Sequence, residues 1–234
     1  MNSKTDHRAM NWSEIKLVVF DVDGTLYDQR RLRLCMLREM ILFSIRNRKI
    51  KFIRILRAYR QIREQLGDSQ QEDFEKVLIA RTSAVVGYSE NLVQATIEEW
   101  MERRPLRHLI RYRYAGLAEL FQNLRMQGKK IGIYSDYPAY QKLEAMNLNA
   151  EIVVCATDKD IGVLKPHPKG LQVLMERVGA NPAETILIGD RPERDGLAAR
   201  AANVQSLILS RKPMDGWRTF SRYEDPILFN LCSA

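Results

Sequence analysis

Two aspartates stand two residues apart directly after a short apolar run, in the segment Asp21-Val-Asp23-Gly24-Thr. Where a strand gives way to a loop, carboxylates at this spacing can both approach one ion, and Gly24 permits the tight turn that this requires. Clustered carboxylate oxygens are hard ligands that suit Mg²⁺. An aspartate beside such a cation is also a competent nucleophile toward phosphorus, because the cation neutralises the phosphoryl oxygens. The segment therefore predicts magnesium-dependent phosphoryl transfer, and a solvated acidic loop that closes a strand is the simpler alternative.

Later positions carry side chains that such a site would use. Ser135 follows another apolar run, and its hydroxyl could bind a phosphoryl oxygen, cap a helix or stabilise a turn. Lys165 lies in a Lys-Pro-His-Pro loop stiffened by its prolines, and its ammonium would offset the charge of acids and phosphate. Asp190 ends a further apolar run and is placed as a third metal ligand. Asp195 could orient Lys165 or a metal-bound water, or could simply stabilise a helix N-terminus.

Apolar runs rich in β-branched residues would form the strands that present these side chains. Continuous rather than alternating apolar residues are typical of strands buried on both faces. The runs are 15–20, 130–134, 151–155, 185–188 and 205–209. Helical patterns lie between them at 115–127, 138–146, 169–178 and 194–202. This alternation predicts an α/β fold with a parallel sheet, whose ligands collect at the carboxyl ends of the strands, where the aspartates lie.

Residues 30–112 break the alternation and have the pattern of helices only. These helices are expected over 31–47, 51–66, 69–86 and 90–103. Because the segment lies between the first and second strands, it is predicted to be a helical module inserted into a core formed by residues 1–29 and 113–215. The tail, residues 216–234, is expected to be partly irregular.

In its motifs and their order the chain resembles the haloacid dehalogenase-like hydrolases. The matching pieces are Asp21-Val-Asp-Gly-Thr, Ser135, Lys165 followed by proline, and Gly189-Asp190 with Asp195. The resemblance covers about residues 14–30 and 113–210, and it implies a Rossmann-like parallel sheet and Mg²⁺-dependent phosphoryl transfer. The inserted helices resemble the family's helical cap of the first type, which closes over the site and reads the leaving group.

The resemblance also implies a role for each residue. Asp21 would be the nucleophile that forms an aspartyl-phosphate, and Asp23 would be the general acid for the leaving group and then the base that activates water. Asp21, the backbone carbonyl of Asp23, and Asp190 would hold Mg²⁺. Ser135 and Lys165 would bind the transferring phosphoryl group. Dehalogenase members carry a different residue at the position of Asp23, so dehalogenation is disfavoured.

Some residues depart from the family's common pattern. Asp136 stands where many members carry Asn, and Arg191 stands where Ser is common, with Arg194 close behind it. No catalytic group of the set is missing, so we predict a phosphatase that hydrolyses a small phosphorylated substrate, a phosphate monoester. Two alternatives stay open: a phosphomutase that passes the phosphoryl group to a sugar hydroxyl, and a non-catalytic protein of the same fold that binds a membrane or a partner.

The net charge of +8 is concentrated in one stretch. Residues 30–66 carry twelve Lys and Arg against two Glu, a net +10, so the rest of the chain sums to −2. Within this stretch, residues 51–66 are predicted to form a basic amphipathic helix. Three interpretations of its basic face stay open: a solvated surface of the cap, a surface that attracts a polyanionic substrate, or a contact with anionic lipid. The apolar helix at 34–45 is a candidate contact for a membrane or a second copy in a homo-oligomer. Alternating Arg and Tyr at 111–114 fit a hinge strand better than nucleic-acid binding, which is disfavoured.

The cysteines and the apolar runs bear on the compartment. Cys35, Cys155 and Cys232 show neither a disulfide framework nor zinc-ligand spacing. No apolar run approaches the roughly 20 residues of a membrane span. The first 14 residues are polar and lack the apolar core of a secretory signal. We therefore predict a cytoplasmic protein, with peripheral association to an anionic membrane through residues 30–66 as an addition.

Overall fold

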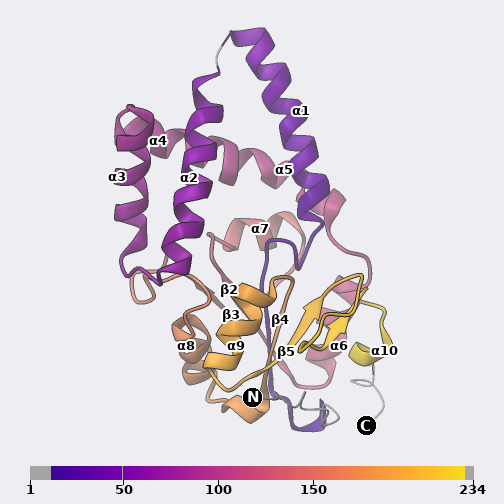
Figure 1. Cartoon of the computed structure of the whole chain (residues 1–234). Coiled ribbons are helices and arrows are strands. Elements are labelled where there is room, and N and C mark those ends of the chain that lie inside the picture. Colours follow the sequence, from indigo (N-terminus) through magenta and orange to yellow (C-terminus); the bar gives the residue numbers. More distant parts are fainter. Residues whose placement is uncertain (1–11, 49, 230–234) are drawn as a thin grey trace.

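A parallel sheet lies at the centre of the molecule. The structure, a computed structural model, describes residues 12–48 and 50–229 (Figure 1). Its strands are ordered β3-β2-β1-β4-β5-β6, and all neighbouring pairs are parallel. Five of them coincide with the predicted runs to within two residues: β1 (Leu17–Phe20), β2 (Lys130–Ser135), β3 (Ile152–Cys155), β4 (Thr185–Gly189) and β5 (Gln205–Leu209). The predicted α/β class with a Rossmann-like parallel sheet is confirmed.

The central strand β1 is buried along its whole length, as its run of apolar residues predicts. Its last residue, Phe20, pairs in register with Ile133 of β2 on one side and Ile188 of β4 on the other. The residues that follow these three strands therefore meet at one edge of the sheet.

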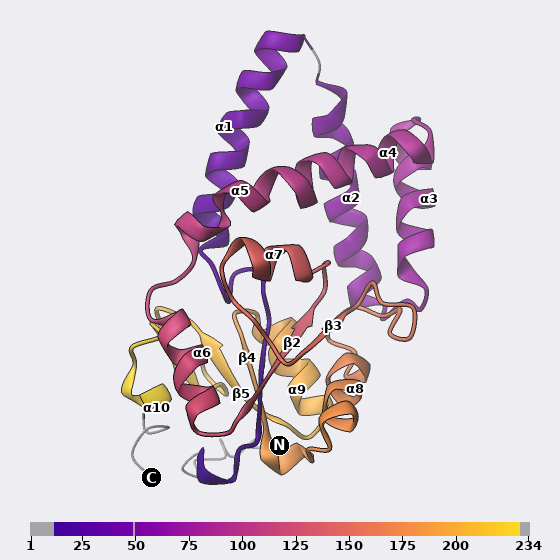
Figure 2. The same cartoon turned by 180° about the vertical axis from the view of Figure 1, so that it is seen from behind.

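Helices cover both faces of the sheet (Figures 1 and 2). On one face, α6 (Leu117–Met126) packs Phe121 against Phe20 of β1, with ring centroids 4.8 Å apart. On the other face, α8 (Lys169–Val178) and α9 (Leu197–Ala201) form a second apolar cluster with Leu17 and Val19. A short helix, α7 (Tyr140–Ala145), follows β2. The two apolar clusters fix the position of β1, and hence of the residues that follow it.

The inserted helices stand over the carboxyl edge of the sheet (Figures 1 and 2). They are α1 (Gln29–Asn47), α2 (Lys51–Asp68), α3 (Phe74–Val86), α4 (Glu90–Ile97), a π-helical turn (Glu98–Arg103) and α5 (Arg104–Tyr112). We call them the cap. The carboxylate of Asp28 starts α1 by accepting from the backbone N–H of Arg31 at 3.0 Å, which is a typical N-cap. Within the described residues, no helix combines the length and apolar composition that a bilayer span requires.

Two details of the predicted cap are wrong. The third helix begins at Phe74, not at Ser69, because Gln70 and Asp73 adopt positive φ angles that interrupt it. The last helix does not end at Arg103 but continues through the π-helical turn to Tyr112. Pro105 stands in the first turn of α5, where a missing N–H is tolerated. The hinge strand expected at 111–114 is therefore absent, and only an isolated bridge between Tyr27 and Arg113 forms there.

The C-terminal segment is more ordered than its sequence pattern predicts. It adds a sixth strand, β6 (Thr219–Phe220), next to β5, and a short helix, α10 (Pro226–Phe229). Tyr223 is buried, and its hydroxyl donates to the backbone carbonyl of Thr25 at 2.7 Å. This segment therefore stabilises the loop after β1 that carries Asp21 and Asp23, which we call the aspartate loop.

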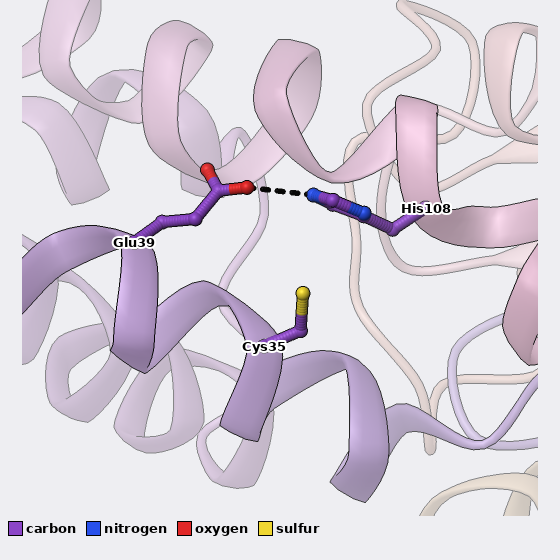
Figure 3. Close-up of side chains that lie close together, drawn as sticks. All are labelled: Cys35, Glu39 and His108. Atoms are coloured by element: carbon purple, nitrogen blue, oxygen red, sulfur yellow. Dashed lines mark hydrogen bonds and ion pairs between the residues drawn. The ribbon is translucent and has the colours of Figure 1, made fainter. Parts of the chain in front are cut away.

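A polar cluster joins α1 to α5 within the cap (Figure 3). Nε2 of His108 lies 2.7 Å from Oε1 of Glu39, and Arg107 also donates to Glu39. Burial raises the pKa of Glu39, but these two contacts outweigh it and hold that pKa below its usual range. Cys35 lies beside them as a free thiol, as does Cys155 in the core, whereas Cys232 lies outside the described residues. The cluster fixes the lower part of α1 against α5.

Candidate active site

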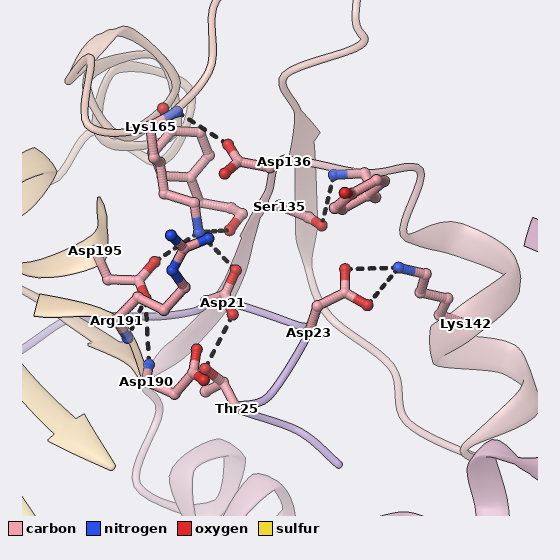
Figure 4. Close-up of polar contacts among 12 residues, drawn as sticks. Asp21, Asp23, Thr25, Ser135, Asp136, Lys142, Lys165, Asp190, Arg191 and Asp195 are labelled. Atoms are coloured by element: carbon pink, nitrogen blue, oxygen red, sulfur yellow. Dashed lines mark hydrogen bonds and ion pairs between the residues drawn. The ribbon is translucent and has the colours of Figure 1, made fainter. Parts of the chain in front are cut away.

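The predicted nucleophile lies at the centre of the carboxyl edge. Asp21 directly follows β1 and is buried. Its Oδ1 accepts from Nζ of Lys165 at 2.5 Å, and its Oδ2 accepts from the hydroxyl of Thr25 at 2.9 Å (Figure 4). Burial is the largest influence on this carboxyl and, despite the attraction of Lys165, raises the pKa of Asp21 to about 6. The carboxylate is therefore oriented by two donors and is little hydrated.

Lys165 links two acids. The residue is 1% exposed, and its ammonium contacts Oδ1 of Asp21, Oδ1 of Asp195 at 2.6 Å and the backbone carbonyl of Tyr134 at 3.1 Å. Burial would lower the pKa of Lys165, but Asp195 and Asp21 outweigh it and raise that pKa well above its usual value. The lysine therefore carries a fixed positive charge beside the nucleophile.

Asp195 is occupied on both oxygens. While Oδ1 binds Lys165, Oδ2 accepts from the backbone N–H groups of Asp190 at 3.2 Å and Arg191 at 3.0 Å. A Cβ on Gly189 would collide with this carboxylate, which explains the glycine at the end of β4. Asp195 thus orients Lys165 and the loop after β4, which is one of the two functional roles predicted for it.

Asp190 has the properties of a metal ligand. Among the described residues, its Oδ1 is the only buried side-chain N or O atom with no hydrogen-bond partner. Its ligand atoms lie within 4.8 Å of those of Asp21 and Asp195. Burial and then the charge of Asp21 raise the pKa of Asp190 to about 8. A divalent cation would satisfy this oxygen and remove the repulsion, so the donor set fits Mg²⁺. Gly24, with a φ of +101°, lets the loop approach, since a Cβ there would collide with Asp190.

Asp23 points toward a residue that the sequence did not single out. Both of its carboxylate oxygens accept from Nζ of Lys142 on α7, at 2.7 and 2.6 Å, and the hydroxyl of Tyr27 donates to it as well (Figure 4). Burial would raise the pKa of Asp23, but Lys142 and Tyr27 outweigh it and lower that pKa. A lysine on a helix has no distinctive spacing, so only the fold reveals that Lys142 belongs to this site.

Ser135 is the last residue of β2 and is fully buried. Its Oγ accepts from the backbone N–H of Tyr137 at 3.2 Å, which fixes the side chain at the carboxyl edge (Figure 4). It does not cap α7, which begins further along at Tyr140. The structure therefore places Asp21, Asp23, Lys165, Asp190 and Asp195 around one cleft, with Ser135 at the end of the neighbouring strand, where its hydroxyl stabilises the turn to Tyr137.

The residues that depart from the family pattern join core and cap. The guanidinium of Arg191 pairs with both carboxylate oxygens of Glu64 on α2, at 3.0 and 3.1 Å. Arg194 is 5% exposed and donates to the backbone carbonyls of Lys165 and Glu64, at 3.0 and 3.1 Å. In the opposite direction, Arg63 of α2 donates to the backbone carbonyl of Asp136. These residues hold the end of α2 against the catalytic loops.

A cleft of about 1230 Å³ opens over these side chains. The predicted site carboxylates Asp21, Asp190 and Asp195 line it, together with basic residues from the surrounding loops and α1. These basic residues include Arg30, Arg31, Arg33, Arg211 and Lys212. Positive charge around a cluster of carboxylates attracts an anion that can then be held next to a metal ion.

Comparisons with known proteins agree with this geometry. The family model of the haloacid dehalogenase-like hydrolases matches residues 15–203. Pyrophosphatase PpaX of Bacillus mycoides (strain KBAB4) is 24% identical over 200 residues, 84% of each chain. The glyceraldehyde 3-phosphate phosphatase of Methanopyrus kandleri is 25% identical over 204 residues, 84% of each chain.

Solved structures share the fold. The putative hydrolase YfnB from Bacillus subtilis, bound to magnesium, superposes with a TM-score of 0.67 at 17% identity, over 93% of this chain and 98% of that one. A 2-haloacid dehalogenase from Pseudomonas syringae pv. Tomato gives a TM-score of 0.64 at 18% identity, over 92% and 98%. With the family model covering most of its length, the chain belongs to the haloacid dehalogenase-like hydrolases.

Proposed function

We propose that this chain is a Mg²⁺-dependent phosphatase that hydrolyses a phosphate monoester through an aspartyl-phosphate on Asp21. The strongest support is one arrangement: Asp21 is oriented by Lys165 and Thr25 directly beside the unpartnered oxygen of Asp190. The relatives named as phosphatases support the same class of reaction. The carboxylate of Asp23 speaks against dehalogenation, which some neighbours of the same fold perform.

The first half of the reaction forms the phosphoenzyme. A carboxylate oxygen of Asp21 attacks phosphorus, the bond from phosphorus to the leaving oxygen breaks, and its electron pair stays on that oxygen. Asp23 supplies the proton that makes the leaving group a neutral alcohol. Lys165 and the hydroxyl of Ser135 bind oxygens of the phosphoryl group as its charge shifts. Mg²⁺, when held by Asp21, the backbone carbonyl of Asp23, and Asp190, supplies further positive charge against those oxygens.

The second half releases phosphate. Asp23, now a carboxylate, takes a proton from a water molecule, and the water oxygen attacks phosphorus. The bond between phosphorus and Asp21 breaks, and the carboxylate returns to its contacts with Lys165 and Thr25. Asp195 keeps Lys165 in place throughout, because its other oxygen is held by two backbone N–H groups.

Release of inorganic phosphate from p-nitrophenyl phosphate with and without Mg²⁺ tests the proposal. Asp21→Asn should lower the rate by about 1,000-fold or more, because an amide oxygen is a poor nucleophile. Asp160→Asn is the matched control, since Asp160 pairs only with Arg177 on the surface. Equal rates for the wild type and Asp21→Asn, or a rate unaffected by EDTA, would contradict the proposal. Transfer of phosphate to a sugar phosphate, with none released to water, would identify a phosphomutase.

We also propose that the exposed end of α1 and the start of α2 contact an anionic membrane surface. We call residues 41–48 and 50–57 the cap tip, and it projects away from the core in Figure 1. It contains no acidic residue. Its exposed apolar side chains are Ile41, Leu42, Ile45, Ile50 and Ile53. Its exposed cations are Arg46, Arg48, Lys51, Arg54 and Arg57. Apolar side chains among cations are the combination that anionic lipid binds.

A further inference from the structure

A second cavity of about 700 Å³ lies inside the cap and begins at the catalytic acid. Its inner end is lined by Asp23, Lys142 and Tyr137, and its walls are formed by α1, α2, the π-helical turn and α5. This volume lies within the roughly 300–1,000 Å³ of pockets that enclose small ligands. This cavity is distinct from the catalytic cleft, because most of the residues that line the cavity belong to the cap helices.

The wall of this cavity is predominantly apolar. Twelve of its twenty lining residues are apolar or aromatic. Met36 and Met40, in the third and fourth turns of α1, line the cavity and lie on one face of that helix together with Leu32. Trp100 and Leu109 face them from the π-helical turn and α5 and are buried. Methionine side chains adapt to flexible apolar ligands, so this wall suits a hydrocarbon chain.

Four of the seven charged residues that line the cavity also line the catalytic cleft, and Arg60, Glu102 and Lys142 line the cavity alone. Asp23, Arg30 and Arg33 line both spaces, so a molecule with its phosphate in the cleft would extend directly into the cavity. The lining also includes Glu102, whose negative charge disfavours an anionic leaving group. Leu34 and Leu37 line the cavity and are also 62% and 51% exposed, so the apolar wall continues onto the outer face of α1.

We propose that this cavity binds the hydrocarbon chain of the leaving alcohol, so that the substrate is the phosphate monoester of an aliphatic alcohol. This rests on the proposed phosphatase function, in which Asp23 protonates the leaving oxygen: whatever that oxygen carries must lie beyond Asp23, where the cavity begins. A polar leaving group would leave the apolar wall without a partner, whereas a hydrocarbon chain fills it. The arginines shared with the cleft then face the phosphate.

A series of soluble alkyl phosphates, from ethyl to octyl and each below its micelle concentration, tests this in the wild-type enzyme. Full burial of one methylene strengthens binding by up to about fourfold. We expect kcat/KM to rise by at least about 10-fold from ethyl to hexyl phosphate and then to level off as the cavity fills. Equal kcat/KM values along the series would overturn the inference while leaving the phosphatase intact. Absence of hydrolysis for every ester, p-nitrophenyl phosphate included, would instead overturn the proposed function.

A cavity-filling variant locates the effect. Met40→Trp should lower the ratio of octyl to ethyl kcat/KM by about 10-fold or more, since the larger ring occupies the space of several methylenes. Val85→Trp, at a position on α3 that is 62% exposed and outside the cavity lining, should leave both values unchanged. Binding of octyl and ethyl phosphate to Asp21→Asn by calorimetry gives the same comparison without turnover. Equal ratios in the wild type and Met40→Trp would show that the hydrocarbon chain of the substrate binds outside this cavity.

Discussion

The ammonium group of Lys142 holds both carboxylate oxygens of Asp23, at distances of 2.7 and 2.6 Å. The pair connects α7 to the aspartate loop, and α7 also packs against α5 of the cap. The residue proposed to protonate the leaving group is therefore ionised and paired while the active site holds no substrate. The pKa of Asp23 therefore depends on its ion pair with Lys142.

Replacing Lys142 with Met should raise the pKa of Asp23, because burial would then be opposed mainly by Tyr27. Since Asp23 must be protonated to act as an acid, the alkaline limb of kcat/KM should move to higher pH. A pH profile of hexyl phosphate hydrolysis measures this shift, because an alkoxide leaving group needs the proton of the general acid whereas p-nitrophenolate leaves without it. Lys142→Arg keeps the positive charge and should show a much smaller shift. If Lys142→Met leaves the limb in place, Asp23 is not the group that titrates.

Asp190→Asn should change how stability depends on pH. The pKa of Asp190 is about 8 in the folded state and 3.8 without the fold, so the folded protein binds more protons between these values. The free energy of unfolding must then fall as pH rises through this window. Asn does not ionise, so in EDTA the variant should be more stable than the wild type at pH 8 and similar near pH 4.

Thermal unfolding in EDTA and in Mg²⁺ measures this difference. At pH 8, Mg²⁺ should raise the Tm of the wild type by much more than it raises the Tm of Asp190→Asn, since ligand binding stabilises the folded state. Parallel curves for the two proteins, with equal Mg²⁺ effects, would rule out a metal at Asp190.

The two arginines that join core and cap should differ in their effect on stability. Arg194→Met removes a buried guanidinium that donates to the backbone carbonyls of Lys165 and Glu64, and it should lower the free energy of unfolding by about 1.5–3 kcal/mol. Arg191→Met loses pairs with Glu64 and Glu193, whose side chains are 53% and 60% exposed, and should cost about 1 kcal/mol or less. Urea unfolding gives both values, and equal losses would contradict the assigned burial.

Two charges placed on the cap tip should weaken its contact with lipid. Leu42 and Ile45 are 67% and 72% exposed, so replacing both with Glu should reduce co-sedimentation with phosphatidylserine vesicles by about 10-fold or more. Val85→Glu adds an exposed charge on α3 and should have little effect. Binding of the wild type should also weaken at high salt, because the basic side chains are screened. No binding of the wild type at low salt would contradict the proposed membrane contact.

The strands were predictable because each is buried on both faces and therefore has an unbroken apolar sequence. β6 was missed because two residues between Gly216 and Pro226 give no periodicity and are strand only through pairing with β5. The extension of the last cap helix was missed because Pro105 usually stops a helix, whereas here it opens a new one after the π-helical turn. In both cases local sequence rules gave way to the tertiary arrangement.

The aspartate motifs were predictable because each lies within a few neighbouring residues and directly follows a strand. The partners of these motifs were not. Lys142 reaches Asp23 across 119 residues of sequence, and Arg194 reaches Glu64 across 130. Such contacts depend on how α7 and α2 are placed over the sheet, which residue spacing alone does not encode. Arg191, noted only as a departure from a pattern, acquires a physical role once α2 is positioned, whereas the side chain of Asp136 accepts from the backbone N–H of Lys165 in the core.

Arg63 and Arg194 cross the boundary between cap and core in opposite directions at the same end of α2. Separation of this end would break the contact of Arg63 with the carbonyl of Asp136 and that of Arg194 with the carbonyl of Glu64 at the same time, while Arg194 would keep the carbonyl of Lys165. These contacts at the end of α2 would have to break before the cap could move away from the core, because α2 itself has no chain connection to the core; the two connections meet where Tyr27 bridges Arg113. Leu34 lines both the catalytic cleft and the cap cavity and, like Leu37, is exposed, so both spaces open to solvent along α1.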